Sequence, residues 1–134
     1  MEIPYQAPIS KKNHRDIDNS SDVFSQLKKR WNKQLSEQQN RASQRRSALI
    51  DNGTAIFKKY SIKKAFLFGS VLEKRCTINS DIDILIIPLN EADYWKIRFD
   101  LEEAIGFPID VYSQSDDPQF IKKIMERGEV IYET

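Results

Sequence analysis

The run Ile-Asp-Ile-Leu-Ile-Ile at residues 82–87 constrains the fold of this chain more than any other segment. It is β-branched and almost continuously apolar, a pattern typical of a central strand that is covered on both faces. Pro88 ends the run, because a proline has no N–H to donate to a strand ladder. A strand buried on both faces needs helices against its sheet, so the sequence predicts an α/β fold.

Shorter segments on either side complete this pattern. They are predicted strands at residues 65–68, 109–112 and 130–132, and predicted helices at residues 92–105 and 118–127. Asp117 is placed to cap the last helix, with Pro118 in its first turn and Gly128 at its end. Together these elements predict a small mixed β-sheet packed with helices and preceded by a long N-terminal helix.

The two halves of the chain carry opposite net charge. Residues 1–60 hold 12 Lys and Arg against 6 Asp and Glu, whereas residues 61–134 hold 9 against 14. Such a split favours an appendage and a core with different roles. We therefore divide the chain into a mobile polar arm at residues 1–20, a basic helical appendage at residues 21–47 and the folded domain at residues 48–134.

The predicted N-terminal helix runs from about Asp22 to Tyr60. Its first part places apolar residues at spacings of three and four, namely Phe24, Leu27, Trp31 and Leu35. The stretch Asp51-Asn52-Gly53 can kink or break it.

The same helix is rich in basic residues. They are Lys28, Lys29, Arg30, Lys33, Arg41, Arg45 and Arg46. Three readings stay open: a solvated face, contact with a protein partner, or contact with a second copy of the chain. Nucleic-acid binding is disfavoured, because Trp31 is the only aromatic residue interleaved with these charges.

Length and composition exclude several classes of protein. A chain of 134 residues suggests one domain with a proper core. The single cysteine, Cys76, excludes an intramolecular disulfide, and no apolar run approaches the ~20 residues of a membrane span, so we expect a cytoplasmic protein. His14 is the only histidine, which excludes histidine-based nucleophilic catalysis and multi-histidine zinc sites.

Five polar or small residues near the strands carry the chemistry. Gly69 and Ser70 follow a predicted strand, and a glycine there lets the backbone approach a phosphate closely. Asp81 and Asp83 are two residues apart, so on a strand their carboxylates face the same side. Asp110 interrupts another predicted strand in the same manner. If the two strands are neighbours, three carboxylates meet near the glycine turn.

Clustered carboxylates repel one another unless a cation lies between them. Mg²⁺ prefers oxygen ligands and typically binds one or two carboxylates together with substrate phosphates. Phosphoryl-type transfer needs mainly positioning and charge neutralisation, which two metal ions and a phosphate-binding turn supply. We therefore predict that Asp81 and Asp83 bind both ions. Asp110 completes the second site and helps to deprotonate an attacking hydroxyl.

The order of these motifs resembles the signature of the polymerase-β superfamily, specifically the minimal nucleotidyltransferases. The resemblance covers about residues 48–134, through the segments FLFGS, SDIDILI, DLEEAIGFPIDVY and IKKIMERGEVIYE. It implies a nucleotidyltransferase sheet with Gly69 and Ser70 at the triphosphate of a nucleotide, with ATP as the substrate. It also implies that the three aspartates are the metal-binding triad.

Many proteins of this family are encoded beside a HEPN-domain partner. The resemblance therefore implies that AMP is moved from ATP onto a tyrosine of a HEPN toxin, with this chain as the antitoxin. Many members carry an Ala-Arg-Gly-like stretch after the Gly-Ser pair, whereas this sequence has Val71–Arg75, with Glu73 near the expected arginine.

Three other functions are alternatives. A catalytically inactive antitoxin would neutralise its partner by contact alone, which Glu73 favours and the intact aspartate triad opposes. A small-molecule nucleotidyltransferase would need a second domain to hold its acceptor, and the chain is too short for one. A two-metal nuclease would need the carboxylates but not the Gly-Ser turn.

Overall fold

A computed structural model describes residues 14–134, with side chains from Asp22 onward. By their contacts these residues fall into two compact units, one ending at Ser36 and one from Glu37 to Thr134. One helix, α1 (His14–Lys59), contributes residues to both units. Residues 1–13, which make up most of the predicted polar arm, lie outside the described residues.

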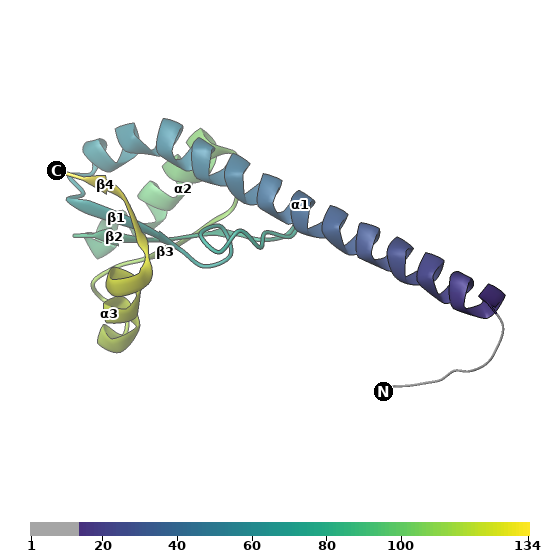
Figure 1. Ribbon diagram of the computed structural model, residues 1–134. Helices are drawn as coiled ribbons and strands as arrows, with labels where there is room; N and C mark the ends of the chain where they lie inside the picture. The colour runs from purple at the N-terminus through teal and green to yellow at the C-terminus, as the bar shows by residue number, and fades with distance from the viewer. Residues whose placement is uncertain (1–13) are drawn as a thin grey trace. The chain divides into compact units, whose positions relative to one another are not determined.

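The strands form one mixed sheet in the order β3–β2–β1–β4 (Figure 1). Their bounds are Lys64–Phe68 for β1, Ile82–Ile87 for β2, Ile109–Tyr112 for β3 and Glu129–Glu133 for β4. β1 pairs antiparallel with β2 and with β4, whereas β2 and β3 are parallel. The parallel pair requires a crossover, which η1 (Glu91–Asp93) and α2 (Tyr94–Ile105) provide. The predicted α/β class is confirmed, as is the long N-terminal helix.

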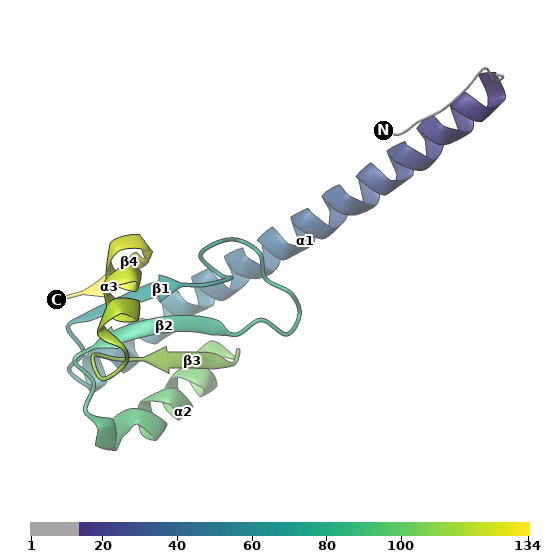
Figure 2. The same cartoon turned by 90° about the horizontal axis from the view of Figure 1, so that it is seen from below.

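Helices cover both faces of the sheet. The C-terminal part of α1 and all of α2 pack on one face, where Ile82 and Ile84 of β2 join the main core. The third helix, α3 (Pro118–Arg127), covers the other face and packs Ile121 against Leu85. In Figure 2 α3 lies in front of the sheet and the C-terminal part of α1 behind it. Because side chains alternate along a strand, Asp83 faces the α3 side.

Helix α1 continues through the stretch Asp51–Gly53, although this sequence can kink or break a helix. Gly53 is buried, and the side chains of Phe57 and Leu49 lie 3.4 and 3.5 Å from the position that its Cβ would take. Both neighbours are buried in the main core. Tertiary packing of an amphipathic face contributes more to helix stability than intrinsic propensity, so packing on either side of Gly53 keeps the helix intact.

Arg45 differs from the other basic residues of α1 whose side chains are described, because its own side chain is buried. Arg45 is only 5% exposed. Its Nη2 donates to the carbonyl of Ile78 at 3.2 Å, and its guanidinium lies 4.6 Å from the ring centroid of Phe107. Arg45 is therefore a core residue and does not belong to a solvated or partner-binding face. It is buried together with Ala42, and both residues precede residue 48, the predicted start of the folded domain.

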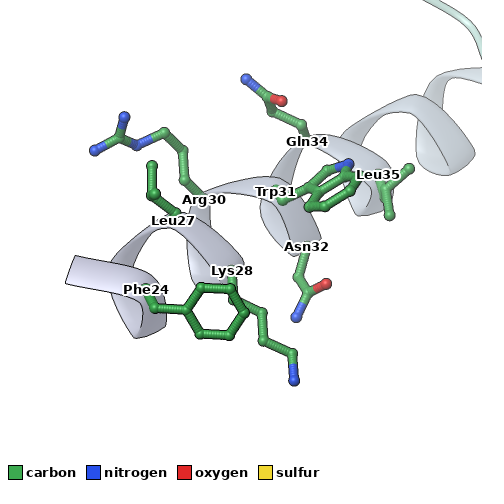
Figure 3. Close-up of a pocket in the computed structure, with 8 residues that line it drawn as sticks. All are labelled: Phe24, Leu27, Lys28, Arg30, Trp31, Asn32, Gln34 and Leu35. Carbon is green, nitrogen blue, oxygen red and sulfur yellow. The ribbon is translucent and has the colours of Figure 1, made fainter. Parts of the chain in front are cut away.

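The apolar stripe predicted on the first part of α1 is exposed. Phe24 and Trp31 are 68% and 67% exposed. Figure 3 shows these two rings with Leu27 and Leu35, and with Lys28 among them. Within the described part of the chain, no helix combines the length and the apolar character needed to cross a membrane.

The same substitution at two positions of α1 tests this division of the helix. Leu49 is fully buried, whereas Leu35 is 44% exposed. We expect Leu49→Ala to lower the free energy of unfolding by about 2–5 kcal/mol, through lost burial and the cavity left behind. Leu35→Ala should lower it by less than about 0.5 kcal/mol. Urea unfolding followed by circular dichroism measures both, and equal losses would contradict the assignment of Leu35 to a surface.

Candidate active site

Strand register brings the predicted aspartates together. Asp83 and Asp110 are Cα partners across the parallel pair of β2 and β3, and Asp81 directly precedes β2. The start of this pair is fixed by the N–H of Ile82, which donates to the carbonyl of Pro108 at 2.9 Å. Three carboxylates that are separated by up to 29 positions in the sequence are thus neighbours at one end of the sheet.

The glycine turn lies against Asp83. Phe68, the last residue of β1, is the Cα partner of Asp83, and Gly69 follows with a φ of 77°. This left-handed conformation favours glycine. A Cβ at position 69 would also collide with a carboxylate oxygen of Asp83. Both the backbone conformation and the space beside Asp83 therefore require glycine here.

Ser70 and the residues after it form a compact turn. The N–H of Arg75 donates to the carbonyl of Ser70 at 2.9 Å, and that of Lys74 to the carbonyl of Val71 at 3.2 Å. The side chains of Glu73 and Arg75 form an exposed ion pair. The acidic residue of this stretch therefore neutralises the arginine that follows it.

The carboxylates of Asp81 and Asp83 are destabilised in their charged form. Burial, and then the charges of Asp110 and Asp81, raise the pKa of Asp83 from 3.8 to about 6. Burial, followed by the charge of Asp110 and a hydrogen bond with it, also raises the pKa of Asp81. Arg98 is a neighbouring cation, with Nη2 3.9 Å from Asp110 Oδ1 and Nε 3.7 Å from Glu102 Oε2. Because Arg98 lies at these distances and is shared between two carboxylates, it neutralises only part of the negative charge of the three aspartates.

Aromatic side chains border the carboxylates on the α3 side. Phe68, Tyr112 and Phe120 pack edge to face, with ring centroids 5.3, 5.4 and 5.8 Å apart. Burial, and then the charge of Asp83, raise the pKa of Tyr112. These three aromatic residues were not among the predicted site residues. The two-residue spacing between Asp110 and Tyr112 was a usable signal, because it places both side chains on one face of β3.

The side chains of the three aspartates are neighbours but are not arranged as a set of metal ligands. Among the residues that the structure describes, no three His, Cys, Asp or Glu side chains form a set that could hold a metal ion. Asp81, Asp83 and Asp110 are close in the backbone, but like charges disfavour one another at short range. Their role as metal ligands stays a prediction, as do the phosphate contacts of Gly69 and Ser70.

A pocket of about 500 Å³ opens beside Asp110 along β3, the edge strand of the sheet. Its lining includes Glu91, Tyr94, Trp95, Asp110, Tyr112 and Asp116. Gln114 fixes one wall, because its side-chain amide accepts from the N–H of Leu89 at 2.9 Å and donates to the carbonyl of Leu89 at 2.7 Å. The pocket therefore gives a ligand direct access to Asp110.

Asp83→Asn tests the repulsion within the cluster. With a pKa of about 6 against 3.8, the folded protein retains a proton that the unfolded chain has released between these pH values. The contribution of Asp83 to stability is therefore highest below about pH 4 and falls as the pH rises to about 6. Above about pH 7 and without divalent cations, Asp83→Asn should raise the free energy of unfolding by about 1–2 kcal/mol, a value reduced for solvent screening at a half-buried group.

Urea unfolding across this pH range measures the effect. Asp51→Asn makes the same substitution at an exposed aspartate of α1 and is the matched control. A lower stability of Asp83→Asn than of the unsubstituted chain at neutral pH would contradict uncompensated repulsion at this site.

Known structures share this fold. A toxin–antitoxin complex with AMP-PNP gives a TM-score of 0.54 at 20% identity, over 66% of this chain and 73% of that chain. A mutant of the toxin–antitoxin MntA-HpeT gives a TM-score of 0.51 at 19% identity, over 60% of this chain and 69% of that chain. No curated protein matches the sequence.

One protein family matches the sequence itself. The family described as "Polymerase beta, Nucleotidyltransferase" matches residues 52–134. This segment holds the whole sheet, the glycine turn and all three aspartates. The chain therefore belongs to the polymerase-β nucleotidyltransferase family.

Proposed function

We propose that this chain is a Mg²⁺-dependent nucleotidyltransferase that moves AMP from ATP onto a tyrosine of a HEPN toxin and thereby acts as its antitoxin. One observation carries the proposal: Asp83 and Asp110 are register partners on adjacent strands, with Gly69 in contact with Asp83. Membership of the family supports nucleotidyl transfer as the reaction.

The chemistry of the donor atoms fits Mg²⁺, which binds carboxylate oxygens together with substrate phosphates. Asp81 and Asp83 would bind both ions, and Asp110 would bind the second. The raised pKa values of Asp81 and Asp83 support this role, because carboxylates that are desolvated and poorly compensated gain most from a nearby cation. When bound, Mg²⁺ neutralises charge that develops on the transferred phosphate.

The turn at Gly69 and Ser70 is the proposed binding site of the triphosphate. Gly69 has no side chain, so a phosphate can approach the backbone closely where the turn begins. Proteins of this fold occur in toxin–antitoxin complexes, one of them with AMP-PNP. These relatives support ATP as the substrate and a toxin as the partner.

In the proposed reaction, the oxygen of the acceptor hydroxyl bonds to the α-phosphorus of ATP. The bond between the α-phosphorus and the oxygen that bridges to the β-phosphate breaks, and its electron pair leaves with pyrophosphate. Asp110 accepts the hydroxyl proton, since the pocket beside it admits an acceptor. Such a transfer depends mainly on positioning and charge neutralisation.

Contact without catalysis is the second candidate function. Arg75 is paired with Glu73, so the turn offers the triphosphate less free positive charge. The exposed stripe on α1, which includes Phe24 and Trp31, offers an apolar surface to a partner or to a second copy of the chain. An inactive antitoxin would neutralise its partner through such a contact.

Calorimetric titration of Mg-ATP tests the nucleotide site. We expect saturable, Mg²⁺-dependent binding to the unsubstituted chain. Asp81→Asn/Asp83→Asn should bind at least about tenfold more weakly, because it removes ligands of both proposed ions. The matched control, Asp51→Asn, should bind like the unsubstituted chain. Equal affinities for the double variant and the control would contradict a metal site at β2.

Neutralisation of the HEPN toxin separates the two candidate functions. If transfer is the function, cells that produce the toxin should grow with the unsubstituted chain but not with Asp81→Asn/Asp83→Asn. The intact mass of the toxin should then increase by AMP only with the unsubstituted chain. Full neutralisation by the double variant, with no AMP on the toxin, would instead support contact alone.

A further inference from the structure

The outer face of α2 exposes two large aromatic side chains. Trp95 and Phe99 are 71% and 62% exposed. They are four residues apart and therefore share one face of the helix. Figure 2 shows α2 beside β3, the strand that carries Asp110. Exposed aromatic residues that are grouped in this way, tryptophan above all, are typical of sites that bind another protein.

This aromatic face continues into the pocket beside Asp110. Trp95 belongs to both, since it also lines the pocket. Tyr94 stands edge-on to Trp95 with ring centroids 4.9 Å apart, and the guanidinium of Arg98 lies 5.6 Å from the Trp95 ring centroid. A chain segment docked on Trp95 and Phe99 can therefore insert a side chain that reaches Asp110.

The pocket carries negative charge. Glu91, Asp110 and Asp116 line it, and none of its lining residues, all within the described part of the chain, is a Lys or Arg. The neighbouring cation, Arg98, is already shared between Asp110 and Glu102. Such a surface attracts a cationic ligand and repels the phosphates of a nucleotide. The pocket is therefore suited to the acceptor, with the triphosphate on the side of the glycine turn.

We propose that the acceptor hydroxyl belongs to a tyrosine within a basic protein segment that docks on Trp95 and Phe99. This inference rests on the proposed function and adds the chemistry of the acceptor segment. The tyrosine ring packs against Tyr94 in the pocket, with its hydroxyl beside Asp110. Lysines or arginines that flank the tyrosine pair with Glu91 and Asp116 and set the orientation of the segment.

Fluorescence of Trp95 reports directly on this surface. The sequence has two tryptophans, so Trp31→Phe in the full chain leaves Trp95 as the single reporter. The probe is a short peptide with a central tyrosine flanked by lysines. We expect a saturable change in Trp95 emission, and at least about tenfold weaker binding when glutamates replace the lysines.

Two alanine variants locate the contact. Phe99→Ala should weaken peptide binding by about tenfold or more. Met125→Ala, which truncates a side chain on α3 that is 47% exposed, should leave it unchanged. Equal binding of the lysine and glutamate peptides, or no saturable response to the lysine peptide, would overturn the proposal. A Trp95 response to Mg-ATP that the lysine peptide does not displace would assign the pocket to the nucleotide and overturn it as well.

The proposed function is tested separately in the same preparation. Calorimetric titration of Mg-ATP alone reports on the nucleotide site and does not depend on the peptide. Peptide binding without any Mg-ATP binding would support the docking surface and contradict the proposed transferase. Mg-ATP binding without peptide binding would overturn only the docking surface.

Discussion

Repulsion among three carboxylates on adjacent strands is the constraint on which the rest of this structure depends. Parallel pairing sets Asp83 beside Asp110. The strands cannot shift to separate them, because Ile82 and Ile109 are fully buried on the opposite face. A slip of one residue would turn those isoleucines toward the other side of the sheet. The repulsion must therefore be relieved locally, by protons or by a bound cation.

The surroundings of the cluster supply little relief from the protein itself. The guanidinium of Arg98 is 3.9 Å from Asp110 and is shared with a second carboxylate. The rings of Phe68 and Tyr112 bury the carboxylates without adding positive charge, and Gly69, which lies against Asp83, has no side chain that could donate a hydrogen bond. Asp83, whose pKa is raised, is the register partner of Asp110, which lines an open pocket, and a perturbed carboxylate in such a position is more typical of a functional site than of a structural ion pair. The arrangement favours a cation that comes from outside the chain.

Sequence patterns predict the parts of this structure that local spacing determines. The alternation along β2 and the cap at Asp117, whose side chain accepts a backbone N–H at 3.1 Å, each lie within a few consecutive residues. The shared face of Asp81 and Asp83 follows from the same spacing. Contacts between distant segments carry no such signal: Arg45 lies in a polar run, and its carbonyl acceptor at Ile78 is 33 residues away. The pocket along β3 likewise forms only when α2 and the loop after β3 come together.

Two opposite electrostatic requirements meet at Asp110. On the side of Gly69, the proposed site must accept a triphosphate, which the carboxylates repel unless cations lie between them. On the pocket side, Glu91 and Asp116 attract positive charge. In the proposed reaction, a basic acceptor segment reduces the negative potential that repels the triphosphate. Binding of the acceptor therefore raises the affinity for the nucleotide, and binding of the nucleotide raises the affinity for the acceptor. In the proposed reaction, this coupling would discriminate against acceptor hydroxyls in neutral or acidic surroundings, so that the charge around a hydroxyl would determine whether it is used.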